Sequence, residues 1–222
     1  MPQPSSPIVC DATFETEALA SGAIFIAGID EVGRGALAGP VVAAAVILDP
    51  ACIPAGLNDS KKLTAATRAK LDVEIRAVAI AYAIARIEAD EIDRINILRA
   101  TRRAMCNAIA ALNPAPDYLL IDALQLKELA ITQKAIIKGD AKSVSIAAAS
   151  IIAKVARDHW MMDYDEEFPG YGFVSNVGYG TATHLQALRA SGPTKIHRLT
   201  FRKVLPEAEQ VGLFAKEHYR ER

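Results

Sequence analysis

The sequence contains few of the residues that build disulfide frameworks or sites for soft metal ions. Its cysteines are odd in number, are widely spaced and form no CxxC pair; they are Cys10, Cys52 and Cys106. This usage is typical of a reducing compartment and gives no support for a disulfide framework or a zinc site. The histidines also lack the spacing of metal ligands; they are His159, His184, His197 and His218.

The sequence also lacks a long apolar run, a targeting segment and an excess of charge. No apolar run approaches the roughly 18 residues that indicate a membrane span. The N-terminal stretch MPQPSSPIVCDATFE has neither the basic flank nor the apolar centre of a signal peptide. We therefore expect a cytoplasmic protein with no membrane partner. The formal net charge of −1 does not indicate nucleic-acid binding, although a local basic stripe would be sufficient for it.

The 222 residues have an ordinary globular composition, with 51% hydrophobic and 23% charged residues. Short apolar, β-branched runs predict strands over residues 24–29, 41–48, 80–87, 117–123 and 135–140. Apolar periodicity predicts helices over residues 64–78, 89–112, 143–160, 181–190 and 206–220, with a loop over 163–180. Strands come first and then alternate with helices, so the order favours an α/β fold with a mixed sheet flanked by helices. We expect a flexible tail over residues 1–22, one domain over 23–203 and a C-terminal helical extension over 204–222.

The glycine-rich stretch GRGALAG at residues 33–39 has a superficial likeness to nucleotide-binding loops. A dinucleotide fingerprint needs a helix to begin at its glycines, whereas Pro40 and a β-branched run predict a second strand here. A phosphate-binding loop needs a Gly-Lys-Ser/Thr sequence, which does not follow. We therefore interpret the stretch as a turn between two antiparallel strands.

Acidic residues follow several of the predicted strands. Asp30 ends the first strand and is followed by Glu31, Asp122 ends the fourth strand, and Asp140 ends the fifth. Clustered carboxylates repel one another, and hard oxygen ligands without His or Cys select Mg²⁺ or Mn²⁺. Any one such Asp is more often only a turn former or a helix cap, and we expect Asp59, Asp117 and Asp158 to cap or pair. Neighbouring strand residues face opposite ways, so Asp30 and Glu31 can act together only if the strand bends or ends there.

The motifs of the chain together resemble those of ribonuclease HII. The matching blocks are GIDEVGRGALAGPVVAAAVIL, LNDSKKL, YLLIDAL, IKGDAKSVSIAAASIIAKVARD, GYGTATH and GPTKIHR, in the family's order over residues 24–203. The resemblance implies a ribonuclease H-like fold and an endonuclease that hydrolyses the RNA strand of RNA–DNA hybrids. It also implies nicking of duplex DNA on the 5′ side of embedded ribonucleotides, which leaves 5′-phosphate and 3′-hydroxyl ends. It implies two-metal-ion catalysis with Mn²⁺ or Mg²⁺, held by Asp30, Glu31, Asp122 and Asp140.

The resemblance also implies which residues bind substrate. Gly33, Arg34 and Gly35 correspond to the ribonucleotide sensor, and glycine lets backbone groups approach a 2′-hydroxyl closely. Tyr179 corresponds to the tyrosine that packs on the sugar beyond the ribonucleotide. The implied phosphate track comprises Ser60, Lys61, Lys142 and Arg198, with Lys138, His197, Arg202 and Lys203 beside them. Val177 stands where the family often has a lysine, so one phosphate contact is expected to be missing.

The tail contains a further motif, QVGLF, at Gln210–Phe214. It resembles the short peptide by which bacterial DNA-handling proteins bind the sliding clamp. The alternative, which we favour, is that these apolar residues pack a terminal helix onto the domain. The family resemblance implies a monomer. Two other functions remain open: a nucleic-acid-binding relative without catalysis, disfavoured by the four acids, and ribonuclease HIII, disfavoured by the short segment before the first strand.

Overall fold

The computed structural model describes residues 10–206, which form two compact units. The first unit comprises the described parts of residues 1–32, 42–85 and 102–155. The second comprises residues 33–41, 86–101 and the described part of 156–222. Several strands and helices have residues in both units, as α5 does. Within residues 10–206, no helix is long and apolar enough to cross a membrane.

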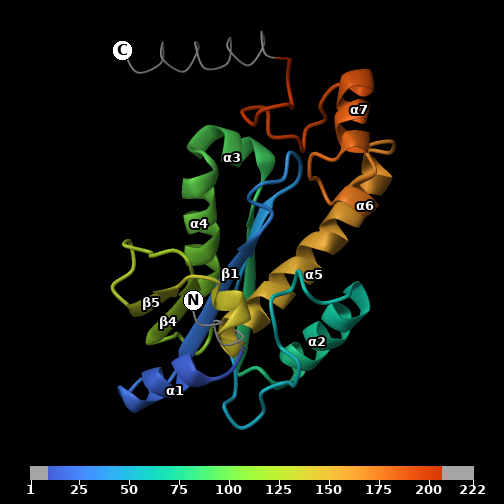
Figure 1. The fold of residues 1–222 in the computed structure, drawn as a ribbon. Helices are drawn as coiled ribbons and strands as arrows, with labels where there is room; N and C mark the ends of the chain where they lie inside the picture. The colour runs from blue at the N-terminus through green and yellow to red at the C-terminus, as the bar shows by residue number, and fades with distance from the viewer. Residues whose placement is uncertain (1–9, 207–222) are drawn as a thin grey trace, which may run out of the picture. The chain divides into compact units, whose positions relative to one another are not determined.

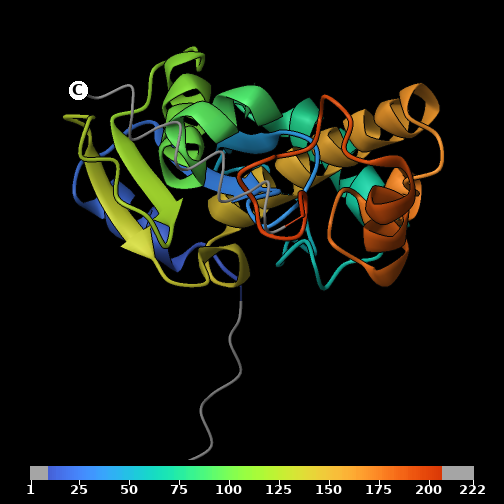
Figure 2. The same cartoon turned by 90° about the horizontal axis from the view of Figure 1, so that it is seen from above.

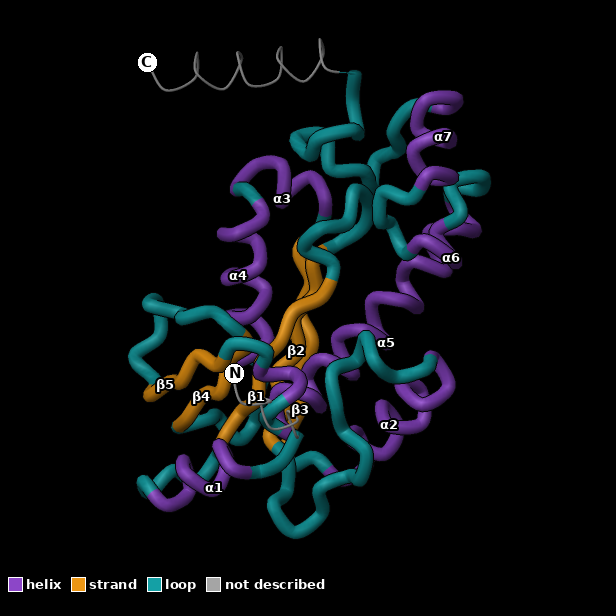
Figure 3. The backbone as a smooth tube through the Cα atoms, viewed as in Figure 1, coloured by secondary structure: helices purple, strands orange, loops and turns teal. Residues whose placement is uncertain are grey.

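A five-stranded mixed sheet forms the centre of the first unit (Figure 3). Its strand order is β3-β2-β1-β4-β5, with bounds Ile26–Val32 (β1), Val41–Ile47 (β2), Ala81–Ile87 (β3), Tyr118–Asp122 (β4) and Thr132–Ile136 (β5). β1 pairs antiparallel with β2, as the turn between them predicted, and parallel with β4. β4 pairs parallel with β5, which lies at the outer edge of the sheet (Figure 2). The predicted mixed sheet with flanking helices is therefore confirmed.

The helices begin and end where local signals place them, with two exceptions. Figure 1 shows α2 (Ala65–Val78), α4 (Ile97–Ala110), α5 (Val144–Glu167) and α7 (Ala182–Ser191). Thr64 caps α2 through its hydroxyl, and Thr181 caps α7 in the same way. The predicted helix over 89–112 is instead broken into α3 (Ala89–Ile95) and α4, because Asn96 adopts a φ of 68°. The predicted loop over 163–180 is also partly wrong, since α5 continues to Glu167 and α6 spans Phe173–Asn176.

The fifth predicted strand is displaced toward the N-terminus. β5 ends at Ile136, because Lys138 adopts the left-handed conformation and turns the chain into a short 3₁₀ helix, η1 (Gly139–Ala141). Ile137, which the prediction placed inside the strand, is 73% exposed. Asp140 therefore lies in η1, and the prediction that it ends a strand is wrong.

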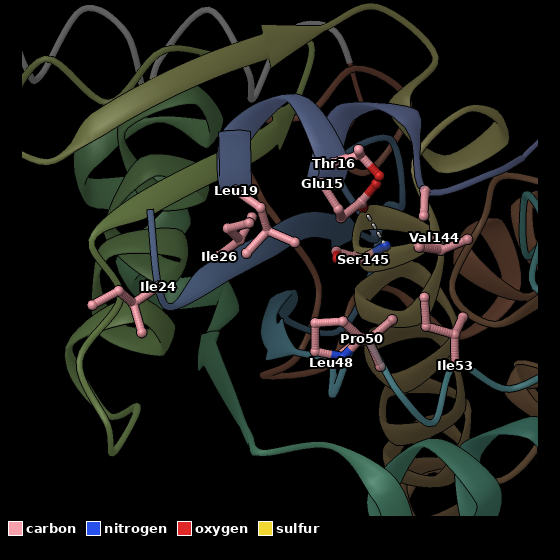
Figure 4. A pocket seen from close by; sticks show the side chains of 11 residues that line it. Glu15, Thr16, Leu19, Ile24, Ile26, Leu48, Pro50, Ile53, Val144 and Ser145 are labelled. Atoms are coloured by element: carbon pink, nitrogen blue, oxygen red, sulfur yellow. Dashed lines mark hydrogen bonds between the residues drawn. The ribbon is translucent and has the colours of Figure 1, made fainter. Parts of the chain in front are cut away.

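Part of the predicted N-terminal tail is helical. Residues Thr13–Ala20 form α1, which packs against β1 and buries Ala18. The side chain of Glu15 points to the start of α5, where its Oε1 accepts a hydrogen bond from Ser145 N (2.9 Å; Figure 4). The same oxygen accepts a second hydrogen bond from Ser143 Oγ (2.6 Å). This long-range anchor was invisible in the sequence because it joins residues about 130 positions apart.

The second unit has its own apolar cluster. Tyr171 and Phe173 stack with ring centroids 5.5 Å apart, and Met161, Leu188 and Ile196 pack in the same cluster. Asp93 of α3 accepts hydrogen bonds from the backbone N–H groups of residues 199 and 200, which anchors the segment after His197. The predicted helix over 206–220 lies outside the described residues except for its first residue.

Candidate active site

Two of the predicted metal-binding acids are neighbours on β1. Asp30 is only 4% exposed, and Glu31 is half-buried. β1 continues to Val32, so Asp30 lies just before the end of the strand instead of at the end. Asp30 Oδ1 accepts a hydrogen bond from the backbone N–H of Glu31 (2.8 Å). Burial, and then the charges of Glu31 and Asp122, raise the pKa of Asp30 well above its ordinary value.

The other two acids lie around the link between β4 and α5. Asp122 is the last residue of β4, as predicted, and its Oδ1 accepts a hydrogen bond from the backbone N–H of Gly139 (2.7 Å). This bond ties the end of β4 to η1, which carries Asp140. Burial and the negative charges of Asp59 and Asp122 raise the pKa of Asp140. The four predicted acids are thus connected electrostatically, since Asp122 acts on both Asp30 and Asp140.

A lysine and a fifth acid accompany this group. Lys61 Nζ lies 3.6 Å from Asp140 Oδ2. Partial burial works to lower the pKa of Lys61, but the charges of Asp140, Asp30, Asp59 and Asp122 outweigh it and raise that pKa. Asp59, Lys61, Asp122 and Asp140 line one surface pocket. The sequence analysis expected Asp59 only to cap or pair, since nothing in the local pattern distinguished it from other such residues.

Ser60 was predicted to contact substrate, but its side chain points inward. It is 3% exposed, and its hydroxyl lies 2.9 Å from the hydroxyl of Ser150 on α5. Ser150 in turn hydrogen-bonds to Asp30. The hydroxyl of Ser60 therefore supports Asp30 through Ser150.

The donor set of the acid group suits a hard divalent cation. It consists of carboxylate oxygens without His or Cys, which is the chemistry of Mg²⁺ and Mn²⁺ sites. Burial, and then neighbouring acids, raise the pKa values of Asp30 and Asp140, so a bound cation would stabilise their charged forms. Within the described range 10–206, however, no three His, Cys, Asp or Glu side chains are already arranged as a metal-binding group. The acids influence one another's charge without forming a preformed triad.

The predicted ribonucleotide sensor belongs to the second unit. Gly33 adopts a φ of +87°, and a Cβ at this position would collide with the side chain of Arg157. Gly35 is exposed, and the nearest atom to a Cβ there would be Cε1 of Tyr179, at 3.9 Å. The glycine-flanked turn and Tyr179 are therefore neighbours in space, although 144 positions separate Gly35 from Tyr179 in the sequence.

Arg198, which was predicted to contact a phosphate, is buried and its guanidinium is occupied by backbone carbonyl groups. It is 0% exposed, and its guanidinium donates to the carbonyl oxygens of Gly39 (2.8 and 3.0 Å) and Arg34 (3.0 Å). Burial, and then the charge of Arg157, lower the pKa of Arg198 to about 9. Arg34 and Tyr179 are exposed and Lys142 is half-buried, so these three keep the access that a substrate contact requires.

The sequence analysis missed Arg157, the second buried arginine. Its guanidinium donates to the carbonyl oxygens of Pro40 (3.0 Å), Ala38 (3.1 Å) and Val177 (2.8 Å), and it lies over the ring of Tyr179 at 5.8 Å. It therefore joins the turn after β1 to the loop that carries Tyr179. The available signal was an arginine among the mainly apolar residues of IIAKVAR.

Comparison with known proteins assigns the chain to a family. The model of the family described as Ribonuclease HII matches residues 27–204. The chain belongs to the ribonuclease HII family. Ribonuclease HII of Cereibacter sphaeroides is 55% identical over 199 residues, which cover 89% of this chain and 93% of that protein.

Solved structures show the same fold. The ribonuclease H2 of Pyrococcus horikoshii OT3 matches with a TM-score of 0.70 and 26% identity, over 87% of this chain and 100% of that one. The ribonuclease HII of Archaeoglobus fulgidus, solved in a complex with PCNA, matches with a TM-score of 0.66 and 24% identity, over 83% of this chain and 97% of that one. Membership of the ribonuclease HII family makes the chain a metal-dependent endoribonuclease that acts on RNA in RNA–DNA hybrids. The prediction of an enzyme is confirmed, against the alternative of a non-catalytic relative.

Proposed function

We propose that this enzyme also nicks duplex DNA on the 5′ side of an embedded ribonucleotide, leaving 5′-phosphate and 3′-hydroxyl ends. The observation that carries the chemistry is the buried Asp30, whose pKa is raised by burial and by its acidic neighbours Glu31 and Asp122. In this proposal Asp30, Glu31, Asp122 and Asp140 hold two Mg²⁺ or Mn²⁺ ions. The bound ions would supply activation of the attacking water and stabilisation of the leaving 3′-oxygen.

The protein's own groups have separate tasks in this proposal. Gly139 N holds Asp122 at the end of β4, and Ser150 together with Ser60 supports Asp30. Lys61, beside Asp140, offers positive charge to the scissile strand. Lys142, two residues after Asp140 in the protein sequence, offers a second positive charge. These contacts orient the scissile phosphate and do not depend on the identity of the neighbouring base.

Recognition of the ribonucleotide belongs to Gly33, Arg34, Gly35 and Tyr179. A 2′-hydroxyl is the group that distinguishes RNA from DNA at a single position. Gly35 is exposed and has no Cβ, so its backbone can approach that hydroxyl closely, while Arg34 can bind a flanking phosphate. Tyr179, whose side chain is exposed next to Gly35, packs on the adjacent sugar.

Cleavage of a duplex that contains one ribonucleotide tests the proposal. An all-DNA duplex and a duplex with a four-ribonucleotide insert serve as substrates beside it, each with Mg²⁺, Mn²⁺ or EDTA. We expect a metal-dependent nick on the 5′ side of the single ribonucleotide and no cleavage of the all-DNA duplex. Cleavage of the insert alone would refute the sensor assignment and leave a hybrid-specific enzyme.

Two variants test the acid assignment. Asp122→Asn keeps an oxygen that can accept the bond from Gly139 N but removes the charge, so we expect at least a ~100-fold loss of turnover with the fold intact. Asp90→Asn, at an exposed position in the first turn of α3, is the matched control and should retain full activity. Unchanged turnover in Asp122→Asn would refute the assignment.

We also propose a cytoplasmic monomer. A sliding-clamp contact depends on Gln210–Phe214, which lies outside the described residues. Pull-down on the purified clamp, with the full chain and with a variant lacking residues 210–222, tests this contact. Loss of capture in the shortened variant would support the contact, and equal capture or none would refute it.

A further inference from the structure

Two buried histidines of the second unit form a continuous hydrogen-bond chain that ends on Tyr179. The backbone N–H of Thr194 lies 2.9 Å from His197 Nδ1, and His197 Nε2 lies 3.0 Å from His184 Nε2. His184 Nδ1 lies 2.9 Å from the carbonyl oxygen of Tyr179. The chain therefore runs from the segment before His197, through both imidazole rings, to the backbone of Tyr179.

The two ends of this chain determine where each proton lies. The N–H of Thr194 can only donate, so His197 Nδ1 accepts and the proton of the neutral ring is on Nε2. That Nε2–H donates to His184 Nε2, which leaves the proton of His184 on Nδ1. The carbonyl oxygen of Tyr179 can only accept, so it receives this proton's hydrogen bond. Every bond is satisfied only when both rings are neutral and carry opposite tautomers.

The surroundings of the pair keep both rings neutral. His184 is 0% exposed and His197 is 2% exposed, and the rings of Tyr171 and Phe173 pack around them. Arg198 follows His197 in the chain, but its guanidinium binds the carbonyl oxygen of Gly39, and Arg157 binds the neighbouring carbonyl oxygen of Ala38. Burial lowers the pKa of His184, and burial together with the charge of His184 lowers the pKa of His197 to about 4. A proton added to His184 Nε2 would face the Nε2–H of His197 and break the chain.

The same chain segment also supports the turn that carries the sensor glycines. His197 forms a β-bridge with Ala38, and the backbone N–H of Arg198 donates to the carbonyl oxygen of Leu37 (2.9 Å). The backbone N–H of Leu37 in turn donates to the carbonyl oxygen of Gly178 (2.8 Å). His184 and His197 thus connect the loop that carries Tyr179 with the segment that follows Gly35.

We propose that His184 and His197 are positioning residues, and that their neutral relay fixes the backbone of Tyr179 so that its exposed ring meets the sugar at the RNA–DNA junction. This inference rests on the proposed role of Tyr179 and adds the residues that hold it. The carbonyl oxygen of Tyr179 also accepts a hydrogen bond from Thr181 N (2.8 Å), and the N–H of Tyr179 donates to Asn176 O (2.9 Å). These two bonds lie within the turn over residues 176–181, whereas the bond from His184 comes from α7. Loss of that contact frees the ring without removing it.

Nuclear magnetic resonance of the full chain tests the relay directly. Long-range ¹H–¹⁵N correlations at pH 7.5 should show His184 protonated at Nδ1 and His197 protonated at Nε2. Coupling between the two Nε2 nuclei across the hydrogen bond should also be detected. A single tautomer shared by both rings, or a charged ring at this pH, would overturn the inference. This measurement does not depend on how the enzyme reads its substrate.

Kinetics of three histidine variants tests the consequence for substrate recognition. The readout is kcat/KM for a single-ribonucleotide duplex divided by kcat/KM for a four-ribonucleotide insert. His184→Phe keeps the aromatic ring but removes both hydrogen bonds, and it should lower this ratio about tenfold, the scale of one lost stacking contact. His184→Asn retains a donor near the position of Nδ1 and should restore most of the ratio. His159→Asn, at an exposed position of α5, is the control and should leave the ratio unchanged.

The same comparison in a Tyr179→Ala background separates the role of the two histidines from the role of Tyr179 itself. If the relay acts through Tyr179, His184→Phe should have no further effect on the ratio in that background. Both variants lose the contact with His197, and they differ in whether a donor to the Tyr179 carbonyl remains. Equal ratios for His184→Phe and His184→Asn would therefore overturn the relay. An unchanged ratio in Tyr179→Ala alone would instead refute the proposed junction contact, and the tautomers would still decide the relay.

Discussion

Removal of Glu15 should destabilise the protein more than its place before the first strand suggests. Its carboxylate accepts two hydrogen bonds at the start of α5, from Ser143 Oγ at 2.6 Å and Ser145 N at 2.9 Å. Each hydrogen bond to a charged group contributes about 1.5–3 kcal/mol, and a negative charge at a helix N-terminus adds about 0.3–1 kcal/mol. Its other oxygen, Oε2, is buried without a hydrogen-bond partner within the described residues, which offsets part of this gain. We therefore expect Glu15→Ala to lower the free energy of unfolding by about 3 kcal/mol.

Two further variants make this prediction specific. Glu15→Gln keeps an oxygen acceptor but removes the charge, so it should cost about 1 kcal/mol. Glu17→Ala, two residues further on α1, removes an ion pair with Lys134 whose side chains are 56% and 42% exposed. Exposed ion pairs contribute at most about 1 kcal/mol, so Glu17→Ala should change stability little.

Urea denaturation followed by circular dichroism measures all three variants. For a chain of this size, a loss of 3 kcal/mol corresponds to a fall in Tm of about 6–12 °C, which a thermal scan would resolve. If Glu15→Ala and Glu17→Ala had equal free energies of unfolding, Glu15 would not anchor α5 and the reasoning would be wrong.

Three other predictions follow from single positions. Gly33→Ala should impair folding, because its Cβ would collide with a buried arginine, whereas Gly35→Ala should keep the wild-type Tm and lose cleavage of a single-ribonucleotide duplex; a lower Tm in Gly35→Ala would contradict this. The pKa of His197 is lowered from 6.5 to about 4, so below pH 6.5 the unfolded chain binds a proton that the folded chain does not. Stability should then fall by about 1–2 kcal/mol between pH 7.5 and pH 5, and urea denaturation of His197→Phe should show a smaller fall. Val177→Lys should steepen the dependence of log Kd for duplex on log salt by about one, as measured by fluorescence anisotropy, and an unchanged slope would exclude a phosphate contact there.

Local patterns were sufficient where the physical cause lies within a few residues along the chain. Thr64 and Thr181 cap helices because their hydroxyls reach N–H groups three residues later. The apolar run before Asp122 predicted a strand that ends at that residue, and the glycine-rich turn predicted that β1 and β2 are antiparallel. The sequence by itself also determined the family, since the blocks that resemble ribonuclease HII lie within residues 27–204, which the family model matches.

Only the tertiary structure decided the roles of charged residues whose partners are distant in sequence. Arg198 resembles a phosphate ligand in GPTKIHR, yet it binds carbonyl groups 159 and 164 positions away and is buried. Glu15 was assigned to a flexible tail because its partners, Ser143 and Ser145, lie about 130 residues later. Charge, hydrophobicity and turn preference are properties of short stretches, so they predict strands, helices and candidate acids. Burial and hydrogen bonding of a long side chain depend on which distant segments pack around it, and folding alone determines that.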